Sequence, residues 1–430
     1  MHRLTLAVLL LNIISAALFI GFFNHPVYDD NYSMYDVHNY AVNGFSAATV
    51  RANNNAPGPT SYAWMAQFVR LLKGSELRSA RVGALVSWIL LAAVVLAGAR
   101  WSAFPETWYS ALLVTLIFPH TLTAMGSALT EGPALLFAVL GVMAWLYFAS
   151  QPALTPRTIF VGMLGGLCLG VAVTCRQYYL ALLPAAAVLA VHRWRSVPRE
   201  AKTRWLLVAV GTLAMAMIPV ITLAWVWKGL SSPGSVLGQT NAHTTVKIGL
   251  NLWRPVIAAF YVAFYLLWLT FPAVFQVYGK RRAWVAVCAV GGGIIAGQLR
   301  ASIIQPGPLA SFLTWTARFP HGASVLFALI STLSIYCFIA LSIMAWKQRA
   351  QLLACAPVLF ALLTVLFFIL EQVGVGGNLL YYERYILQIA PFLGIISFAL
   401  FPKLTIPRGL VFLALFALSQ GMLWRYTVGR

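Results

Sequence analysis

The sequence predicts an all-α polytopic membrane protein with about 13 transmembrane helices in a single domain, residues 1–430. Hydrophobic residues make up 61% of the chain and charged residues only 9%, and the mean hydropathy is +0.83. A soluble domain has about 25% charged residues. The longest polar interval, 24–81, is itself interrupted by an apolar patch at Trp64–Leu72. The composition therefore leaves no room for a soluble domain between the apolar segments.

The apolar segments define the predicted spans, since a helix needs about 20 apolar residues to cross the hydrocarbon core. In chain order the spans are 5–23, 82–98, 107–125, 129–149, 158–175, 178–192, 203–227, 253–277, 283–303, 323–345, 351–370, 385–401 and 406–422. The first run begins like a signal peptide, but no small-residue cleavage site follows it. We therefore predict that it is retained as the first span.

Basic residues predict the orientation of the spans. With the amino terminus inside, the positive-inside rule is satisfied by four basic stretches that all fall on the cytoplasmic side, namely 192–204, 280–282, 347–349 and Lys403 with Arg408. Merging 158–175 and 178–192 into one helix would move the last three stretches outside. The sequence therefore predicts two helices there rather than one.

The net charge of +20 follows from scarce acids and from basic loops beside spans, so nucleic-acid binding is not predicted. The five cysteines lie in apolar segments without metal-ligand spacing and are interpreted as small hydrophobic residues. We find no glycine-rich phosphate loop followed by lysine, no His/Cys cluster and no Ser/His/Asp constellation.

Every aspartate of the chain lies in one short window behind the first span, "NHPVYDDNYSMYD". Under the predicted topology, seven of the nine acids fall on the outer side or at its interface: Asp29, Asp30, Asp36, Glu76, Glu131, Glu371 and Glu383. Acids contribute little to topology, and ionisable groups near the hydrocarbon region are functional candidates. The clustering therefore indicates an outward-facing site.

The first external loop, 24–81, combines a proline-rich turn at 57–59 with an amphipathic segment. Apolar side chains recur there at helical spacing, namely Tyr62, Trp64, Met65, Phe68, Leu71 and Leu72. We expect this helix to lie along the membrane surface with Arg70 and Lys73 toward the headgroups. A surface helix that only caps the bundle has the same periodicity and remains the alternative.

This order of features resembles the C superfamily of lipid-linked-sugar glycosyltransferases, and within it family 39, the protein O-mannosyltransferases and aminoarabinose transferases. That family has an acidic pair after the first span, a proline-containing turn and an arginine-containing stretch entering the second span. The corresponding stretches are Asp29–Asp30, "APGPTSY" and "ELRSARVGALVSW". Three later stretches also resemble the family: "MGSALTEGPALLFAVL" with Glu131, "TCRQYYLALLPAA" with Arg176, and "YYERYILQIAPFLGII" with Arg384.

The resemblance implies a glycosyltransferase that moves a sugar from a polyprenyl-phosphate donor to a lipid, glycan or protein acceptor, with inversion at the sugar carbon. This transfer needs a base for the acceptor proton and cations for the departing phosphate. In the family the first acid is usually essential. We therefore expect Asp29 to be the base, with Asp30 and Glu131 as further catalytic acids and Asp30 in an orienting role.

Arginine forks match phosphate oxygens and stay charged when desolvated. The predicted substrate-binding residues are thus Arg176 and Arg384 for the phosphate, with Tyr62, Tyr178, Lys247 and Glu383 around the same cavity; the external loops 228–252 and 371–384 lie beside it. The alternative for each arginine is a structural ion pair with Glu131, Glu371 or Glu383. For Tyr178 it is a place in the interfacial aromatic belt.

No cofactor is required, because the lipid phosphate is already a leaving group; a divalent cation near Asp29 and Glu131 is compatible with the sequence, and no metal ligands are assigned. We expect an integral protein of the bacterial inner membrane with its site facing the periplasm or exterior, although a lumenal site in the endoplasmic reticulum would give the same pattern. Two alternatives remain. A transporter or flippase would show internal repeats and midplane charges, and a scaffold could keep the fold without the activity.

Overall fold

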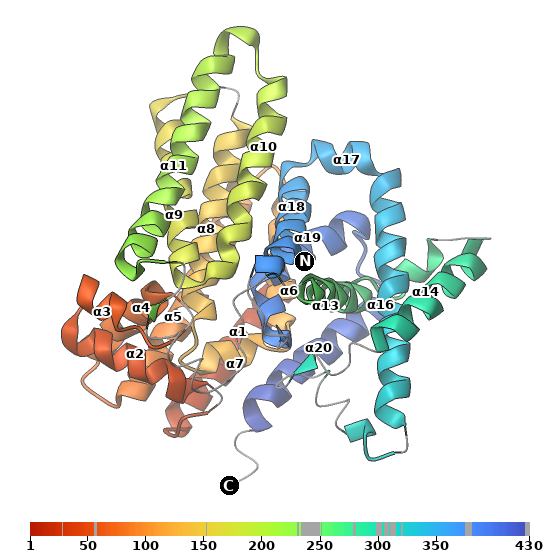
Figure 1. Ribbon diagram of the computed structural model, residues 1–430, viewed down its shortest axis with the longest axis horizontal. Coiled ribbons are helices and arrows are strands. Elements are labelled where there is room, and N and C mark those ends of the chain that lie inside the picture. The colour runs from red at the N-terminus through yellow and green to blue at the C-terminus, as the bar shows by residue number, and fades with distance from the viewer. Residues whose placement is uncertain are drawn as a thin grey trace.

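The computed structural model describes the chain except for residues 28, 56–57, 152, 230–231, 234–249, 251, 278–280, 298–302, 305–308, 310–314, 320, 375–380 and 426–430. The described part is a helical bundle with one pair of two-residue parallel strands, in which β1 (Ile303–Ile304) pairs with β2 (Tyr381–Tyr382) (Figure 1).

The helices follow the apolar runs of the sequence. The amino-terminal helices are α1 (His2–Phe22), α2 (Asp30–Asn43), α3 (Ala47–Arg51), α4 (Pro59–Leu71) and α5 (Glu76–Trp101). The central elements are α6 (Pro105–Ile117), α7 (Thr121–Gly126), α8 (Glu131–Ser150), α9 (Pro156–Cys175), η1 (Gln177–Ala181), α10 (Leu182–Ser196), η2 (Arg199–Ala201) and α11 (Lys202–Trp227). The carboxy-terminal elements, besides the strands, are α13 (Trp253–Thr270), η3 (Ala273–Gln276), α14 (Arg282–Gly297), α16 (Gly322–Lys347), α17 (Arg349–Ala354), α18 (Ala356–Glu371), η6 (Gln372–Gly374), η7 (Glu383–Ile389), α19 (Ala390–Leu400) and α20 (Ile406–Trp424).

Within the described residues, nine helical segments are long and apolar enough to cross a membrane, and they contain α1, α5, α8, α9, α11, α13, α16, α18 and α20. Two shorter apolar helices span Arg282–Ile294 and Arg384–Leu400. The predicted all-α polytopic fold class is confirmed. The count of 13 spans stays a prediction.

Two predictions about helix boundaries have different outcomes. The two-helix prediction for 158–192 is confirmed, because α9 ends at Cys175, Arg176 is extended (φ −151°, ψ 121°), and α10 follows after η1. The single span predicted over 107–125 is wrong, since α6 ends at Ile117 and α7 begins at Thr121. Pro119 causes this break: it has no amide hydrogen to donate, and it favours the extended conformation found at Phe118 (φ −61°, ψ 136°).

Helices α2, α3 and α4, which lie in the predicted first external loop, form a cap at one end of the bundle. Figure 1 shows α2, α3 and α4 grouped at one end of α9 and α11, while the connection from α10 to α11 lies at the opposite end. The predicted amphipathic helix is α4, which buries Tyr62, Met65 and Ala66. Arg70 is exposed, and its position toward lipid headgroups stays a prediction. Its Nε donates to the carbonyl of Ala41 at 2.7 Å. It thereby pairs a carbonyl at the end of α2 that the helix itself leaves unpaired.

Helices α9 and α11 pack in close contact. A Cβ atom on Gly166 would lie 2.0 Å from the carbonyl oxygen of Thr212, and one on Gly170 would lie 2.1 Å from that of Ala216. Both contacts join α9 to α11. Small residues at such positions let helices in a membrane approach backbone to backbone, and here they fix the end of α9 from which Arg176 emerges.

Candidate functional site

The predicted acids and arginines come together at the end of the bundle that α2 and α4 cover. Asp29 directly precedes α2, and its side chain is 35% exposed. It forms an ion pair with Nη1 of Arg384, which belongs to η7, 355 positions later in the chain, and is 14% exposed. Asp29 is therefore a carboxylate that is reachable from outside and held beside a guanidinium.

Asp30 has a different environment from its neighbour. It is fully buried, and its Oδ2 accepts from Nη2 of Arg81 at 2.5 Å and from the amide of Val27 at 2.9 Å. Its Oδ1 accepts from the amide of Ala128 at 2.7 Å. Arg81, also fully buried, donates to the carbonyls of Phe23 and His25 at 2.5 and 2.7 Å. This network joins the end of α1, the start of α2, α5 and the segment before α8.

A second buried ion pair lies where α8 begins. Nη2 of Arg176 is 2.6 Å from Oε1 of Glu131, and Nε of Arg176 donates to Oγ1 of Thr130 at 2.8 Å. The two charged side chains are 5% and 1% exposed. The structural pairing that the sequence left as an alternative for Arg176 is thus present, whereas Arg384 pairs with Asp29.

Tyr62 of α4 lies among these charges. Its side chain is only 1% exposed, and burial raises its pKa well above the ordinary value for tyrosine. It interacts electrostatically with both Arg176 and Arg384, as well as with Glu131. The predicted residue Tyr62 is therefore close to both arginines, but its side chain is buried.

The third aspartate, Asp36, stabilises the fold of the loop. It accepts from the amides of Asn54 and Asn55 at 2.8 and 3.1 Å and from Nδ2 of Asn55 at 2.7 Å. Burial raises the pKa of Asp36, and these hydrogen bonds oppose that shift. Asp36 thereby holds the segment before the proline-rich turn against α2.

Gly58 and Thr60 contact the end of α9 directly. The amide of Gly58 donates to the carbonyl of Cys175 at 3.0 Å, and the hydroxyls of Thr60 and Thr174 are 2.8 Å apart. Since Arg176 follows Cys175, this contact holds the Arg176 backbone in place.

Replacing Gly58 by alanine should disturb this contact. The new Cβ would lie 1.8 Å from the carbonyl oxygen of Thr174, and such overpacking costs about 1–3 kcal/mol. We expect a lower thermal unfolding temperature of the purified protein. Gly74→Ala is the matched control, because no atom of the described residues lies within 4 Å of a Cβ there. Equal unfolding temperatures for the two variants would contradict the docking.

Arg254 is a buried cation that sequence reasoning missed. It lies in the first turn of α13 and is 4% exposed. Its Nε donates to Oε1 of Gln372 at 3.2 Å and its Nη2 to the hydroxyl of Tyr178 at 3.3 Å. The ring of Tyr178 packs 4.9 Å from that of Tyr385, which follows Arg384. The available signal was an arginine at the edge of an apolar span.

Two of the predicted substrate-binding residues are not, or not fully, among the described residues. Lys247 falls outside the described residues, as does the side chain of Glu383, although the Glu383 backbone belongs to η7. The described His, Cys, Asp and Glu side chains form no group of three that could hold a metal ion.

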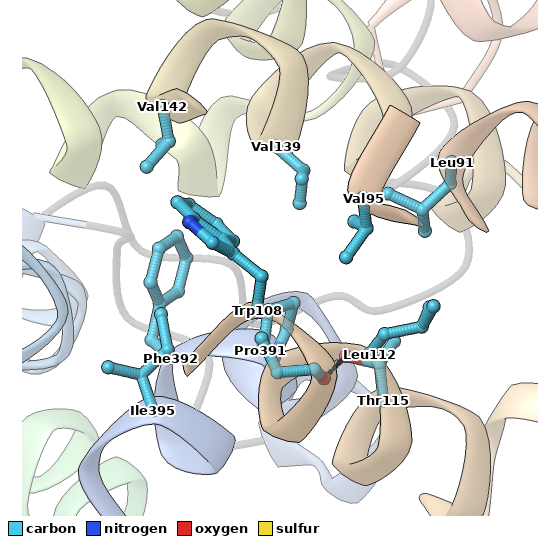
Figure 2. Close-up of a pocket in the computed structure, with 11 residues that line it drawn as sticks. Leu91, Val95, Trp108, Leu112, Thr115, Val139, Val142, Pro391, Phe392 and Ile395 are labelled. Carbon is cyan, nitrogen blue, oxygen red and sulfur yellow. Dashed lines mark hydrogen bonds between the residues drawn. The ribbon is translucent and has the colours of Figure 1, made fainter. Parts of the chain in front are cut away.

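An apolar cavity lies between α5, α6, α8 and α19, away from these charges. Figure 2 shows Trp108, Leu112 and Phe392 among the side chains around it. Its space is that of about one water molecule. This cavity is too small for a lipid chain or a sugar.

Part of the chain matches a protein-family model. Residues 51–229, less than half of the chain, match the family model "Dolichyl-phosphate-mannose-protein mannosyltransferase" (PMT). The comparison with curated proteins gave no match. Among solved structures, the chain is similar to ArnT from Cupriavidus metallidurans bound to undecaprenyl phosphate, with a TM-score of 0.43 and 15% identity over 98% of this chain and 77% of ArnT. For the apo state of ArnT the values are 0.41 and 14%, over 96% and 77%. The family match confirms the resemblance of this chain to the C superfamily of membrane glycosyltransferases.

Proposed function

We propose that this protein is a membrane glycosyltransferase that transfers a sugar from a polyprenyl-phosphate donor at the outer face of a bacterial inner membrane. The observation that carries the proposal is the Asp29–Arg384 pair, a reachable carboxylate beside a guanidinium at the covered end of the bundle. The match to a family described as using dolichyl-phosphate mannose supports a lipid-phosphate donor.

The proposed sugar transfer moves one proton and releases one leaving group. Asp29 accepts the proton of the acceptor hydroxyl, whose oxygen forms a bond to the anomeric carbon of the sugar. The bond from that carbon to the phosphate oxygen breaks on the opposite side, and polyprenyl phosphate leaves. Arg384 stabilises the phosphate charge as it develops, which is most effective when the cation is held in place beforehand.

Asp30 and Glu131 have positioning roles in this proposal. Both oxygens of Asp30 accept hydrogen bonds from buried groups of the protein, and Glu131 is buried against Arg176. A proton acceptor must come within hydrogen-bond reach of the acceptor hydroxyl, and Asp29 alone of the three carboxylates is substantially exposed. Asp30 fixes the start of α2, and Glu131 holds Arg176.

The donor class is tested by binding of undecaprenyl phosphate to the purified protein. Arg384→Gln removes a charged hydrogen-bond donor, worth about 1.5–3 kcal/mol, so we expect affinity to fall at least about tenfold. The charge-matched control is Arg78→Gln, an exposed arginine of α5. Binding that is absent in the wild type, or lost equally in both variants, would reject this role of Arg384.

A further inference from the structure

A set of buried polar atoms without hydrogen-bond partners lies along α7. Within the described residues, Nε2 of His120, Oγ1 of Thr123 and Oγ of Ser127 have no partner. The three residues are at most 3% exposed. Thr123 lies within α7, and His120 and Ser127 flank that helix on either side. The chain continues from Ser127 to Thr130 and to Glu131, the first residue of α8.

A second element at the site, η7, carries the same kind of group. Gln388 is 1% exposed, and neither its amide oxygen nor its amide nitrogen has a partner among the described residues. It follows Arg384 in η7, and its backbone carbonyl accepts from the hydroxyl of Tyr179 at 3.4 Å. His120 interacts electrostatically with Arg384. Both α7 and η7 pack against α8, whose first residue, Glu131, pairs with Arg176.

Their chemistry distinguishes these groups from the arginines. A buried polar group without a partner costs free energy, so native structures contain few of them. Hydroxyl, amide and imidazole groups complement ligands that both donate and accept hydrogen bonds. An ionised phosphate, by contrast, only accepts hydrogen bonds and is bound by donors such as arginine. A sugar ring presents several hydroxyls of this kind.

We propose that His120, Thr123, Ser127 and Gln388 form the subsite that binds the hydroxyl groups of the transferred sugar. This inference rests on the proposed function and adds to it the elements that bind the sugar, α7 with its flanking residues and η7. Arg384 then lies between this subsite and the lipid phosphate. The sugar reaches the subsite when α7 and η7 move apart from α8, against which both pack.

The test compares binding of undecaprenyl phosphate with and without a sugar, using lipids that carry mannose, glucose, galactose or arabinose. Wild type should bind at least one glycosylated lipid more tightly than the bare lipid. Thr123→Val and Gln388→Leu should each lower the ratio of affinities for glycosylated and bare lipid about tenfold, which is the effect of one lost hydrogen bond to a ligand. Affinity for the bare lipid should not change.

A structural control separates recognition from folding. The hydroxyl of Thr364, in the middle of α18, is also buried and has no partner in the described part of the chain. Thr123→Val and Thr364→Val should therefore both keep or raise the unfolding temperature, but only Thr123→Val should weaken sugar binding. Ser127→Ala provides a further subsite variant if Gln388→Leu does not fold.

Three outcomes would overturn the subsite. Unchanged sugar preference in Thr123→Val and Gln388→Leu would mean that the polar groups bind water only. Equal affinity of wild type for bare and glycosylated lipids would reject the subsite and leave the lipid-phosphate donor standing. Absence of binding to all these lipids would reject the proposed function itself, and the subsite with it.

Discussion

Asp29→Asn is expected to lower the rate of sugar transfer by about 10²–10⁴-fold, the usual contribution of a general base. The amide cannot accept the acceptor proton, yet it has nearly the same shape as the carboxylate. Asp29 is partly exposed, so its replacement should leave the fold intact. The measurement is transfer of radiolabelled sugar by membranes that contain equal amounts of wild-type or variant protein.

Glu76→Gln is the matched control for this result. Glu76 is a half-exposed acid at the same end of the bundle, and it pairs with Nδ1 of His38 at 3.0 Å. Its substitution removes the same charge without touching the Asp29–Arg384 pair, so transfer should continue at the wild-type rate. An unaffected rate in Asp29→Asn, or an equal loss in Glu76→Gln, would contradict the assignment of the base.

Arg81→Ala should cause the largest loss of stability among single substitutions at this end of the protein. It leaves the fully buried Asp30 carboxylate without its cation, and breaking a buried ion pair from one side costs about 3–5 kcal/mol. It also removes the donors to the carbonyls of Phe23 and His25. Denaturant unfolding of the detergent-solubilised protein measures the effect.

The exposed His38–Glu76 pair supplies the comparison. Its side chains are 58% and 49% exposed, and exposed pairs contribute only about 0–1 kcal/mol. His38→Ala should therefore change the free energy of unfolding little. If Arg81→Ala were no more destabilising than His38→Ala, the Asp30–Arg81 pair would not be the anchor of α2 that we infer.

The sequence predicted the helices well where hydropathy and charge agree. The break between α9 and α10 was predictable because merging the two would have placed three basic stretches outside. The break between α6 and α7 was not predicted, since apolar residues continue on both sides of Pro119 and hydropathy alone does not register a missing amide hydrogen. The helix α4 was predictable from its periodicity, but the contact of Arg70 with α2 was not.

In the site, sequence motifs located the charged residues but did not predict how they pair or which of them are buried. Family-like motifs located Asp29, Glu131, Arg176 and Arg384, but nothing in the sequence indicated that Arg384 pairs with Asp29 rather than with a glutamate. Adjacent aspartates also look equivalent in a sequence. Only the fold distinguishes the partly exposed Asp29 from the buried Asp30, because Arg81 and the amide of Ala128 reach Asp30 from distant segments.

A glycosyltransferase, unlike a transporter or a scaffold, breaks the bond between the sugar and the lipid phosphate. The most direct measurement is the fate of a radiolabelled undecaprenyl-phosphate sugar, tested with hexose and pentose donors, when the purified protein is reconstituted in liposomes with extracted envelope lipids and glycans as acceptors. We predict that one molecule of undecaprenyl phosphate appears for each labelled sugar that moves to an acceptor. If every donor remains chemically intact, whether or not it crosses the bilayer, the protein is a transporter or a scaffold and the account fails.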